Sequence, residues 1–393
     1  RWVSVALMEK PREALAQSFG RTKAESLDAF VAVLRGHANS SNNTIFADAD
    51  GRIAYFHANF VPVRDPRFDY SRPVDGSDPA TDWRGVHAFE ASPNTIDPPN
   101  GWVVNTNDWP YLAAGNVSPR REDYPAYMDR GHDNPRAEHA RALLEGASDW
   151  TLEGLRAAAF DPWLPAFERL VPPLVADFAA LPPADPRRAR LAGPVEALRS
   201  WDRRWGADSA PTTLASFWAD ELLRRLRREA DEAGVDLSEL AARASAREAR
   251  LAAFEAAVGR IERDFGSWRT PWGEVNRYQR RTGEIEQPFD DAAPSLPVPF
   301  VSGRWGSLAS FGAGPRNGSR RWYGTNGNSF VAVVELGPTV RALAVTAGGL
   351  ASDPASPHFA DQAERYASGD LREVYLARAD VERHAERSYR PGL

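Results

Sequence analysis

Apolar residues recur at helical spacing near the start of the chain and predict two helices, over residues 11–18 and 23–34. The second helix opens with a capping box, in which Thr22 and Glu25 satisfy the first free backbone N–H groups. Its apolar residues fall on one face, so this face is expected to be buried.

Alternating apolar residues then predict a hairpin with strands over residues 43–47 and 52–56. Gly51 supplies the positive φ that the turn of this hairpin needs. Residues 62–100 are irregular and rich in Pro, Asp and Arg, and a loop of this length inside a compact domain is usually functional or wraps the surface. A further strand is expected over residues 101–105.

From about residue 137 to residue 265 the spacing of apolar residues becomes helical. One apolar stripe ends near Gly234, and Asp236 with Glu239 caps the helix that follows. The stripe consists of Leu214, Phe217, Trp218, Leu222 and Leu226.

Alternation returns after residue 265 and predicts a second hairpin, with strands over residues 328–336 and 340–346. A last helix is expected over residues 359–367, after Pro357. The order of these elements favours an α+β fold with a helical insertion over a regular βαβ array.

The composition narrows the class of protein. The 393 residues carry a net charge of −6, and no Lys/Arg run is interleaved with aromatic residues, so a nucleic-acid partner is not expected. No apolar stretch approaches the roughly 20 residues of a membrane span. The chain has no cysteine, which excludes a thiol nucleophile, a disulfide scaffold and cysteine metal sites.

Several motifs of known chemistry are incomplete. The segment Asp48-Ala-Asp-Gly51 resembles the start of a calcium loop, but the closing Glu is absent, which favours a tight turn. The nearest approach to a nucleophile elbow is Gly327-Asn328-Ser329, where Val331 replaces the second Gly. The histidines never form a His-Glu-x-x-His pattern, so a zinc peptidase is not expected.

Two alternative hypotheses for the function of the chain require no nucleophilic serine. A glycoside hydrolase would use a pair of carboxylates, for which the candidates are Asp108, Asp264, Glu274 and Asp361. A non-catalytic binding module would use a tryptophan-rich cleft, for which the candidates are Trp83, Trp102, Trp109, Trp268 and Trp272.

The expected strand at 101–105 runs into the polar corner Asn105-Thr106-Asn107-Asp108, which Pro110 ends. An amide side chain presented there can donate a hydrogen bond to a developing oxyanion, although Asn more commonly caps a turn. Arg136 opens a helix, where its simplest role is to bind a loop carboxylate or carbonyl.

The order of several short motifs resembles the penicillin acylase family of N-terminal-nucleophile amidohydrolases. These motifs are the Ala-Asp-x-x-Gly-x-Ile-x-Tyr hairpin at 43–55, the x-Pro-x-Arg segment at 61–64, the strand at 101–107, the Arg-initiated helix at 136–144, and the segments 268–273, 327–329 and 356–362. Each motif is weak alone, and their number and order make the resemblance fairly specific.

The resemblance implies a partial four-layer αββα core and hydrolysis of linear amides by an N-terminal serine whose own α-amine serves as base. Residue by residue, Asn107 matches the oxyanion Asn of the family and Arg136 matches its active-site Arg. Asn105 is a secondary candidate, because it shares the face of Asn107 if the backbone stays extended.

The chain departs from the family pattern at its start. Only residues 1–46 precede the hairpin Ala47, Arg1 cannot be the nucleophile, and Ser4 has no free α-amine. We therefore expect the C-terminal part of a large (β) subunit, inactive alone. One incomplete acylase domain is expected, with a sheet and helix core at 1–136, a helical insertion at 137–265 and a return to the β-rich core at 266–393.

The resemblance also implies partners and a compartment. The expected substrate is a small N-acyl compound such as an acyl-homoserine lactone, a lipopeptide or a β-lactam. The expected protein partners are the small (α) subunit and the missing N-terminal part of the same precursor. The chemistry needs no cofactor, structural calcium is possible in the intact protein, and periplasmic or secreted location is expected.

Overall fold

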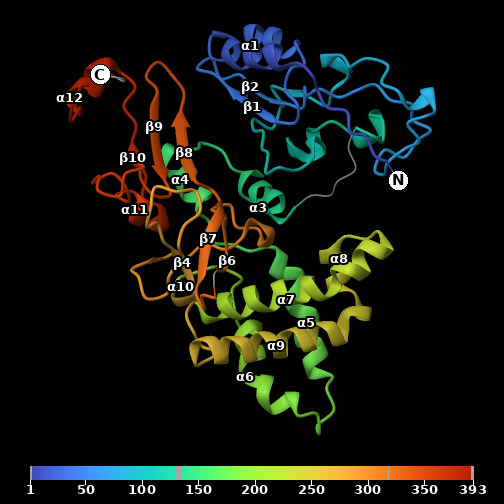
Figure 1. Ribbon diagram of the computed structural model, residues 1–393, viewed down its shortest axis with the longest axis vertical. Helices are drawn as coiled ribbons and strands as arrows, with labels where there is room; N and C mark the ends of the chain where they lie inside the picture. The colour runs from blue at the N-terminus through green and yellow to red at the C-terminus, as the bar shows by residue number, and fades with distance from the viewer. Residues whose placement is uncertain (1, 129–133, 317, 391–393) are drawn as a thin grey trace. The chain divides into compact units, whose positions relative to one another are not determined.

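The computed structural model describes residues 2–128, 134–316 and 318–390, and Figure 1 shows its helices and strands. The mixed α+β composition agrees with the fold class expected from the sequence. The chain forms two compact units, one made of residues 1–147 and 336–340, the other of residues 148–335 and 341–393.

The first unit opens with two helices, which precede a small antiparallel sheet. The sheet order is β1-β2-β3, and its hairpin matches the one expected from the alternation of apolar residues. Side chains of α2, β2 and the loops around them form one apolar cluster, with Leu27, Leu34, Ala54, Phe56, Ala58 and Phe89 buried. The elements are α1 (Pro11–Arg21), α2 (Leu27–Leu34), β1 (Thr44–Ala47), β2 (Ile53–Phe56) and β3 (Thr95–Ile96).

The expected capping box at Thr22 is wrong. Helix α1 extends to Arg21, and the Thr22 hydroxyl donates to the Phe19 carbonyl oxygen at 2.7 Å, closing that helix. Helix α2 begins later, and its N-cap is Ser26, whose hydroxyl oxygen accepts from the Ala29 N–H at 3.2 Å. The cap is therefore the polar residue directly before the apolar run.

The expected strand over residues 101–105 is also wrong. Residues 101–105 pair with no strand in the described part of the chain. The Val104 N–H donates instead to the Ala113 carbonyl oxygen at 2.7 Å. The loops around this segment contain short 3₁₀ turns. Helix α3 (Pro135–Leu144) follows, and it begins one residue before Arg136, where the sequence predicted its start. These turns are η1 (Pro79–Thr81), η2 (Phe89–Ala91), η3 (Pro110–Leu112), η4 (Gly115–Val117) and η5 (Arg121–Asp123).

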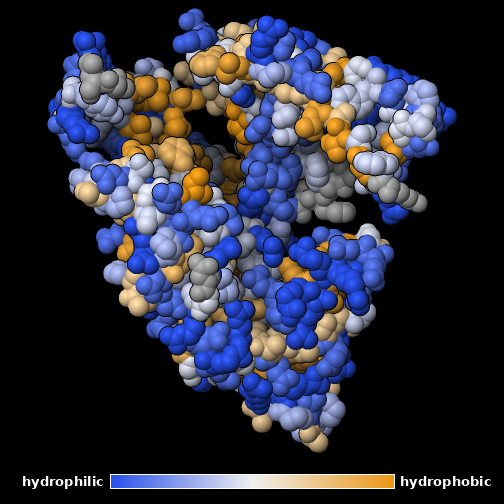
Figure 2. Space-filling view, viewed as in Figure 1, coloured by the Kyte–Doolittle hydropathy of each residue, from blue (hydrophilic) through white to orange (hydrophobic). Residues whose placement is uncertain are grey.

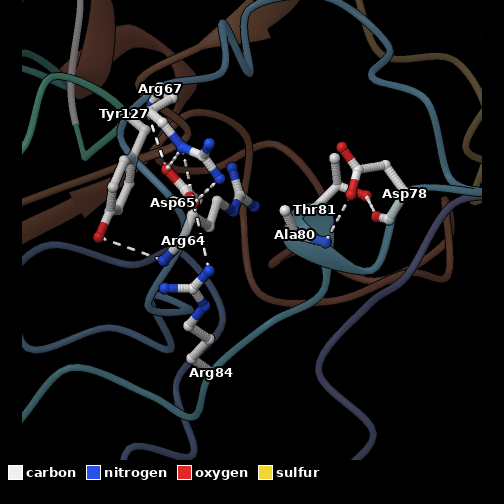
Figure 3. Close-up of polar contacts among 8 residues, drawn as sticks. All are labelled: Arg64, Asp65, Arg67, Asp78, Ala80, Thr81, Arg84 and Tyr127. Atoms are coloured by element: carbon white, nitrogen blue, oxygen red, sulfur yellow. Dashed lines mark hydrogen bonds and ion pairs between the residues drawn. The ribbon is translucent and has the colours of Figure 1, made fainter.

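The long loop at 62–100 is ordered by side-chain contacts. Figure 3 shows the Asp65 carboxylate beside Arg67 and Arg84, with Arg67 donating through Nε at 3.0 Å and Nη2 at 2.8 Å, and Arg84 through Nη2 at 3.2 Å. The hydrogen bonds from Arg67 hold the pKa of the Asp65 carboxyl well below its usual range. The carboxylate is thus ionised at all ordinary pH values and ties together distant parts of the loop.

The second unit begins with a bundle of helices. The expected apolar stripe lies on α7 with every member buried, and α7 ends where Gly234 adopts a φ of 64°. The single helix expected after Asp236 is two helices, because a 3₁₀ turn at Ala244–Ala246 separates α8 from α9. The helices are α4 (Leu152–Ala159), α5 (Ala166–Ala179), α6 (Arg187–Arg199), α7 (Ala210–Ala233), α8 (Leu237–Ala242) and α9 (Arg247–Phe265).

Two sheets complete the second unit. One has the order β5-β4-β7-β6, in which β4 and β7 are parallel, and the other has the order β10-β9-β8. Their strands are β4 (Asn276–Tyr278), β5 (Leu296–Pro297), β6 (Phe311–Pro315), β7 (Trp322–Gly327), β8 (Phe330–Glu335), β9 (Arg341–Thr346) and β10 (Arg372–Glu373).

The pairing of β8 with β9 confirms the second expected hairpin. Phe330 and Val334 of β8 are exposed, and Figure 2 shows hydrophobic surface in this region. The last expected helix is shorter than anticipated, because α11 spans Ala363–Ser368. The remaining short helices are α10 (Trp272–Val275), η7 (Gly303–Trp305) and α12 (Arg378–Arg383). No helix within the described ranges is both long and apolar enough to cross a bilayer.

Candidate active site

The polar corner at residues 105–108 is a turn closed by its own side chains. The buried Asp108 carboxylate accepts from the Thr106 N–H at 2.9 Å and from the Asn105 side-chain amide at 3.1 Å. The Asn105 side-chain oxygen accepts from the Asn107 N–H at 3.1 Å. Side chains thus replace the strand partner that this segment lacks.

Asn107 occupies the tip of this turn with a φ of 60°. Among residues other than Gly, Asn is one of the few that adopt this left-handed conformation readily, since its short polar side chain bonds locally. The side chain is exposed. The backbone therefore lifts the Asn107 amide out of the turn, toward solvent.

The N-terminus of α3 is fastened to the same corner. Asn134 caps the helix by accepting from the Arg136 N–H at 3.0 Å, while its amide nitrogen donates to the Thr106 carbonyl oxygen at 2.9 Å. The Arg136 guanidinium donates through Nη2 to the Thr106 carbonyl oxygen at 2.5 Å and to the Asn107 side-chain oxygen at 3.1 Å. The two residues singled out in the sequence are therefore in direct contact.

This contact fixes the orientation of the Asn107 amide. A guanidinium can only donate hydrogen bonds, so the atom that faces Arg136 is the amide oxygen Oδ1. The amide is planar, and its Nδ2 consequently points away from Arg136 as an available donor. Asn105 differs, because its Nδ2 and Oδ1 are both engaged inside the turn.

Arg136 is half-buried, and this burial lowers the pKa of its guanidinium, while the nearby Asp108 carboxylate acts in the opposite direction. An arginine remains protonated at any physiological pH even after such a shift. The corner therefore holds a permanent positive charge next to the Asn107 amide.

A polar pair that the sequence analysis missed lies behind the corner. The Asn43 amide nitrogen donates to the Asp108 carbonyl oxygen at 3.4 Å, and the Asn43 side-chain oxygen faces His57 Nδ1 at 2.9 Å. The His57 imidazole is buried, and this burial lowers its pKa to about 4. Hairpin register could have found the pair, because Thr44 lies opposite Phe56 and the next positions are therefore Asn43 and His57.

The candidate carboxylates of the glycoside hydrolase hypothesis are divided between the two units. Asp108 belongs to the first unit, whereas Asp264 and Glu274 line a cleft of about 500 Å³ in the second. Asp264 is ion-paired with Arg260 at 3.4 Å and with a second arginine at 3.3 Å. Asp361 accepts from His358 Nδ1 at 2.9 Å. Nothing in these contacts isolates an acid and base pair.

The candidate tryptophans have separate surroundings. Trp272 is buried in the core of the second unit, where its indole N–H donates to the Phe300 carbonyl oxygen. In the first unit, Trp83 and Trp102 line different clefts. Trp83 and Trp102 therefore do not share one of these clefts, and Trp272 belongs to a core instead.

The segment at Asp48 is a turn, as expected. Its carboxylate accepts from the backbone N–H groups of Asp50 at 3.1 Å and Arg52 at 2.9 Å, and Gly51 has a φ of 83°. Among the residues that the structure describes, no group of three His, Asp or Glu side chains could hold a metal ion. Arg1 lies outside the described residues.

Comparison with known proteins agrees with this fold. A model of the penicillin amidase family matches residues 1–383. The chain therefore belongs to the penicillin amidase family. The resemblance stated from the motifs is therefore confirmed.

Individual relatives are distant. The chain is 28% identical over 208 residues to penicillin G acylase of Escherichia coli, a match that covers 47% of this chain and 21% of that protein. It is 27% identical over 202 residues to the penicillin acylase 2 proenzyme of Pseudomonas sp. (strain SE83), covering 48% of this chain and 23% of that protein. The matched segments thus span less than a quarter of either relative.

A solved structure shows the fold. The thermostable penicillin G acylase from Alcaligenes faecalis in orthorhombic form is similar with a TM-score of 0.60 at 16% sequence identity. The similarity covers 98% of this chain and 73% of the other. The α+β fold is therefore that of a penicillin acylase along nearly the whole chain.

Proposed function

We propose that the complete protein in which this chain lies hydrolyses linear amide bonds of N-acyl substrates, and that Asn107 supplies one donor of its oxyanion hole. One observation carries the proposal. The Arg136 guanidinium holds the Asn107 side-chain oxygen at 3.1 Å, which leaves the exposed Asn107 amide nitrogen as a fixed donor. A donor held in place before the reaction stabilises a developing oxyanion without reorganisation.

The proposed reaction starts with a serine that has a free α-amine and comes from a part of the protein outside residues 1–393. The hydroxyl attacks the acyl carbonyl carbon, and its proton passes to the α-amine through a water molecule. The carbonyl oxygen becomes an oxyanion, to which Asn107 Nδ2 donates. The C–N bond breaks as the amine leaves with a proton, and water then hydrolyses the acyl-enzyme.

Arg136 acts on this reaction through Asn107. It fixes the amide orientation and adds positive charge near the developing negative oxygen. The chain alone is expected to be inactive, because the serine comes from elsewhere. Acyl-homoserine lactones, lipopeptides and β-lactams are the substrate classes to test, and a structural calcium and a periplasmic or secreted location stay predictions.

Replacing Asn107 by Gly in the complete protein tests the proposal. Glycine keeps the left-handed backbone at this position and removes only the amide. We expect kcat for an N-acyl substrate to fall roughly a hundredfold to a thousandfold, as for the loss of other oxyanion donors. The measurement is steady-state release of the amine product.

The matched control is Asn116→Ala, which removes an exposed amide of the same unit. Its kcat is expected to stay within about twofold of the wild-type value, since surface substitutions away from special contacts have small effects. An Asn107→Gly protein with wild-type kcat would contradict the assignment of the oxyanion donor.

A further inference from the structure

The buried side of the 105–108 corner contacts a polar pair that takes no part in the proposed chemistry. Asn43 lies just before β1, and His57 lies just after β2, so the pair closes the open end of the hairpin. The Asn43 side-chain amide contacts His57 on one side and the Asp108 carbonyl oxygen on the other. The pair thereby joins the hairpin of β1 and β2 to the 105–108 corner.

The hydrogen bonds of this pair have a defined direction. Because the Asn43 amide nitrogen donates to a carbonyl oxygen, its Oδ1 is the atom that faces His57. A carboxamide oxygen only accepts, so His57 Nδ1 carries the hydrogen that it donates over 2.9 Å. The low pKa of the buried imidazole agrees with a neutral ring that keeps this tautomer.

The backbone of His57 makes a separate contact that does not involve its imidazole. Its backbone N–H donates to the Asn94 side-chain oxygen at 2.8 Å, and the Asn94 amide nitrogen donates to the Phe89 carbonyl oxygen at 2.9 Å. Phe89 belongs to the apolar cluster of the first unit. These bonds hold the backbone of His57, whereas the contact that reaches the corner runs from its buried imidazole to Asn43.

The carbonyl oxygen that Asn43 contacts also accepts from the Asn105 amide, at 3.3 Å. Asn105 in turn accepts the Asn107 N–H and thereby sets the backbone at the tip of the turn. The hairpin end and the donor residue are therefore linked by four consecutive contacts, His57 to Asn43 to Asp108 to Asn105 to Asn107.

We propose that Asn43 and His57 are positioning residues, which hold the 105–108 turn in the conformation that presents the Asn107 amide to the oxyanion. The inference rests on the proposed function, since it assigns a role within that site. Small displacements of a donor reduce its value in the transition state, whereas ground-state binding of the acyl group changes little.

Two variants of similar burial separate positioning from stability. Asn43→Leu removes the link between His57 and Asp108, whereas Asn94→Leu removes the amide on the other side of His57, away from the corner. Both side chains are half-buried and make two side-chain hydrogen bonds, so both variants are expected to lose similar stability. Only Asn43→Leu is expected to disturb the corner.

The first readout uses the complete protein and needs no activity. With ¹⁵N-labelled asparagine, we expect the side-chain amide signals of Asn107 and Asn105 to shift or broaden in Asn43→Leu and to stay unchanged in Asn94→Leu. His57→Asn, which retains a donor near the Nδ1 position, is expected to restore the signals relative to His57→Leu. Unchanged signals in Asn43→Leu would overturn the positioning role whatever the enzyme does.

The second readout is kinetic and uses the complete protein. Asn43→Leu is expected to lower kcat about tenfold or more with KM within about twofold, and Asn94→Leu is expected to leave both constants near wild type. Equal losses of kcat in the two variants would show that the effect arises from lost stability alone, and this result would overturn the inference.

The two readouts also separate this inference from the proposed function. If Asn107→Gly leaves kcat unchanged while the amide signals respond to Asn43→Leu, the oxyanion assignment fails and the structural link stands. If Asn107→Gly abolishes kcat and Asn43→Leu alters neither kcat nor the signals, the assignment stands and the positioning role fails.

Discussion

Helices α7 and α9 of the second unit and the corner at 105–108 of the first unit are held by different kinds of contact. The helices pack through apolar side chains such as Trp218, Phe254 and Val258, which are completely buried. The corner is held by hydrogen bonds that polar side chains make with one another and with the backbone. A helix core can repack with many apolar residues, whereas the corner depends on particular atoms.

The same contrast extends to charge. In the second unit, Arg250 is buried and its Nε donates to Asp177 at 2.7 Å, within the apolar surroundings of α9. In the first unit, Arg136 is half-buried and faces uncharged acceptors, the Thr106 carbonyl and the Asn107 amide. The charge of Arg250 is thus balanced by its direct partner, whereas the hydrogen-bond acceptors of Arg136 carry no charge.

The largest effect on stability is expected from the helix core. Trp218 is completely buried, and Trp218→Ala should lower the free energy of unfolding of the second unit by about 3–5 kcal/mol, because it leaves a large cavity. Urea unfolding followed by circular dichroism at 222 nm measures it. The exposed Trp150→Ala in the same unit should change it by less than about 1 kcal/mol. Equal effects would break the proposed contrast.

A smaller effect on the free energy of unfolding is expected from the titration of His57. The pKa of His57 is about 4 in the folded chain, against 6.5 for an unperturbed imidazole. The unfolded chain therefore binds more protons between these values, so this contribution to stability is complete above pH 6.5 and is lost as the pH falls toward 4. The difference amounts to about 3 kcal/mol.

Comparing the wild type with His57→Asn isolates that contribution, since all other titrating groups are shared. Between pH 7.5 and pH 4, the wild type should lose about 3 kcal/mol more of its unfolding free energy than the variant, measured by urea unfolding. Parallel pH curves for the two proteins would show that His57 is not held neutral.

The smallest effect distinguishes two candidate caps in the first unit. Ser26→Ala should lower the free energy of unfolding by about 1 kcal/mol, because the Ala29 N–H loses its acceptor. Thr22→Ala should cost less, since its exposed hydroxyl bonds only to a carbonyl at the end of α1. Thermal unfolding of both variants gives the order, and the reverse order would restore the capping box expected from the sequence.

Apolar periodicity carried much of the fold information. It located both hairpins and the stripe on α7, because each buries one face against a core. It failed at residues 101–105, where the apolar residues suggested a strand but hydrogen bonding gave none. It also merged α8 and α9, since the apolar spacing continues across the turn at 244–246.

The candidate site was found by a different route. The pattern of the sequence marked Asn107 and Arg136 as candidates, and the resemblance to a family gave them their expected roles. Nothing in their spacing indicated that they touch. Their contact depends on the left-handed backbone at Asn107 and on the cap at Asn134, which are properties of the folded loop. The pair Asn43 and His57 was not predicted, because neither residue belongs to a motif that indicates a function.

The left-handed backbone at Asn107 has a consequence for how this site can change in evolution. The residue types that adopt such a conformation readily are Gly, Asn and Asp. Of these, Asn alone carries a side-chain N–H donor. A homologue with Gly or Asp at this position could therefore keep the loop intact while losing the proposed oxyanion donor. If the proposal holds, this single position separates relatives that can retain the chemistry from those that retain only the fold.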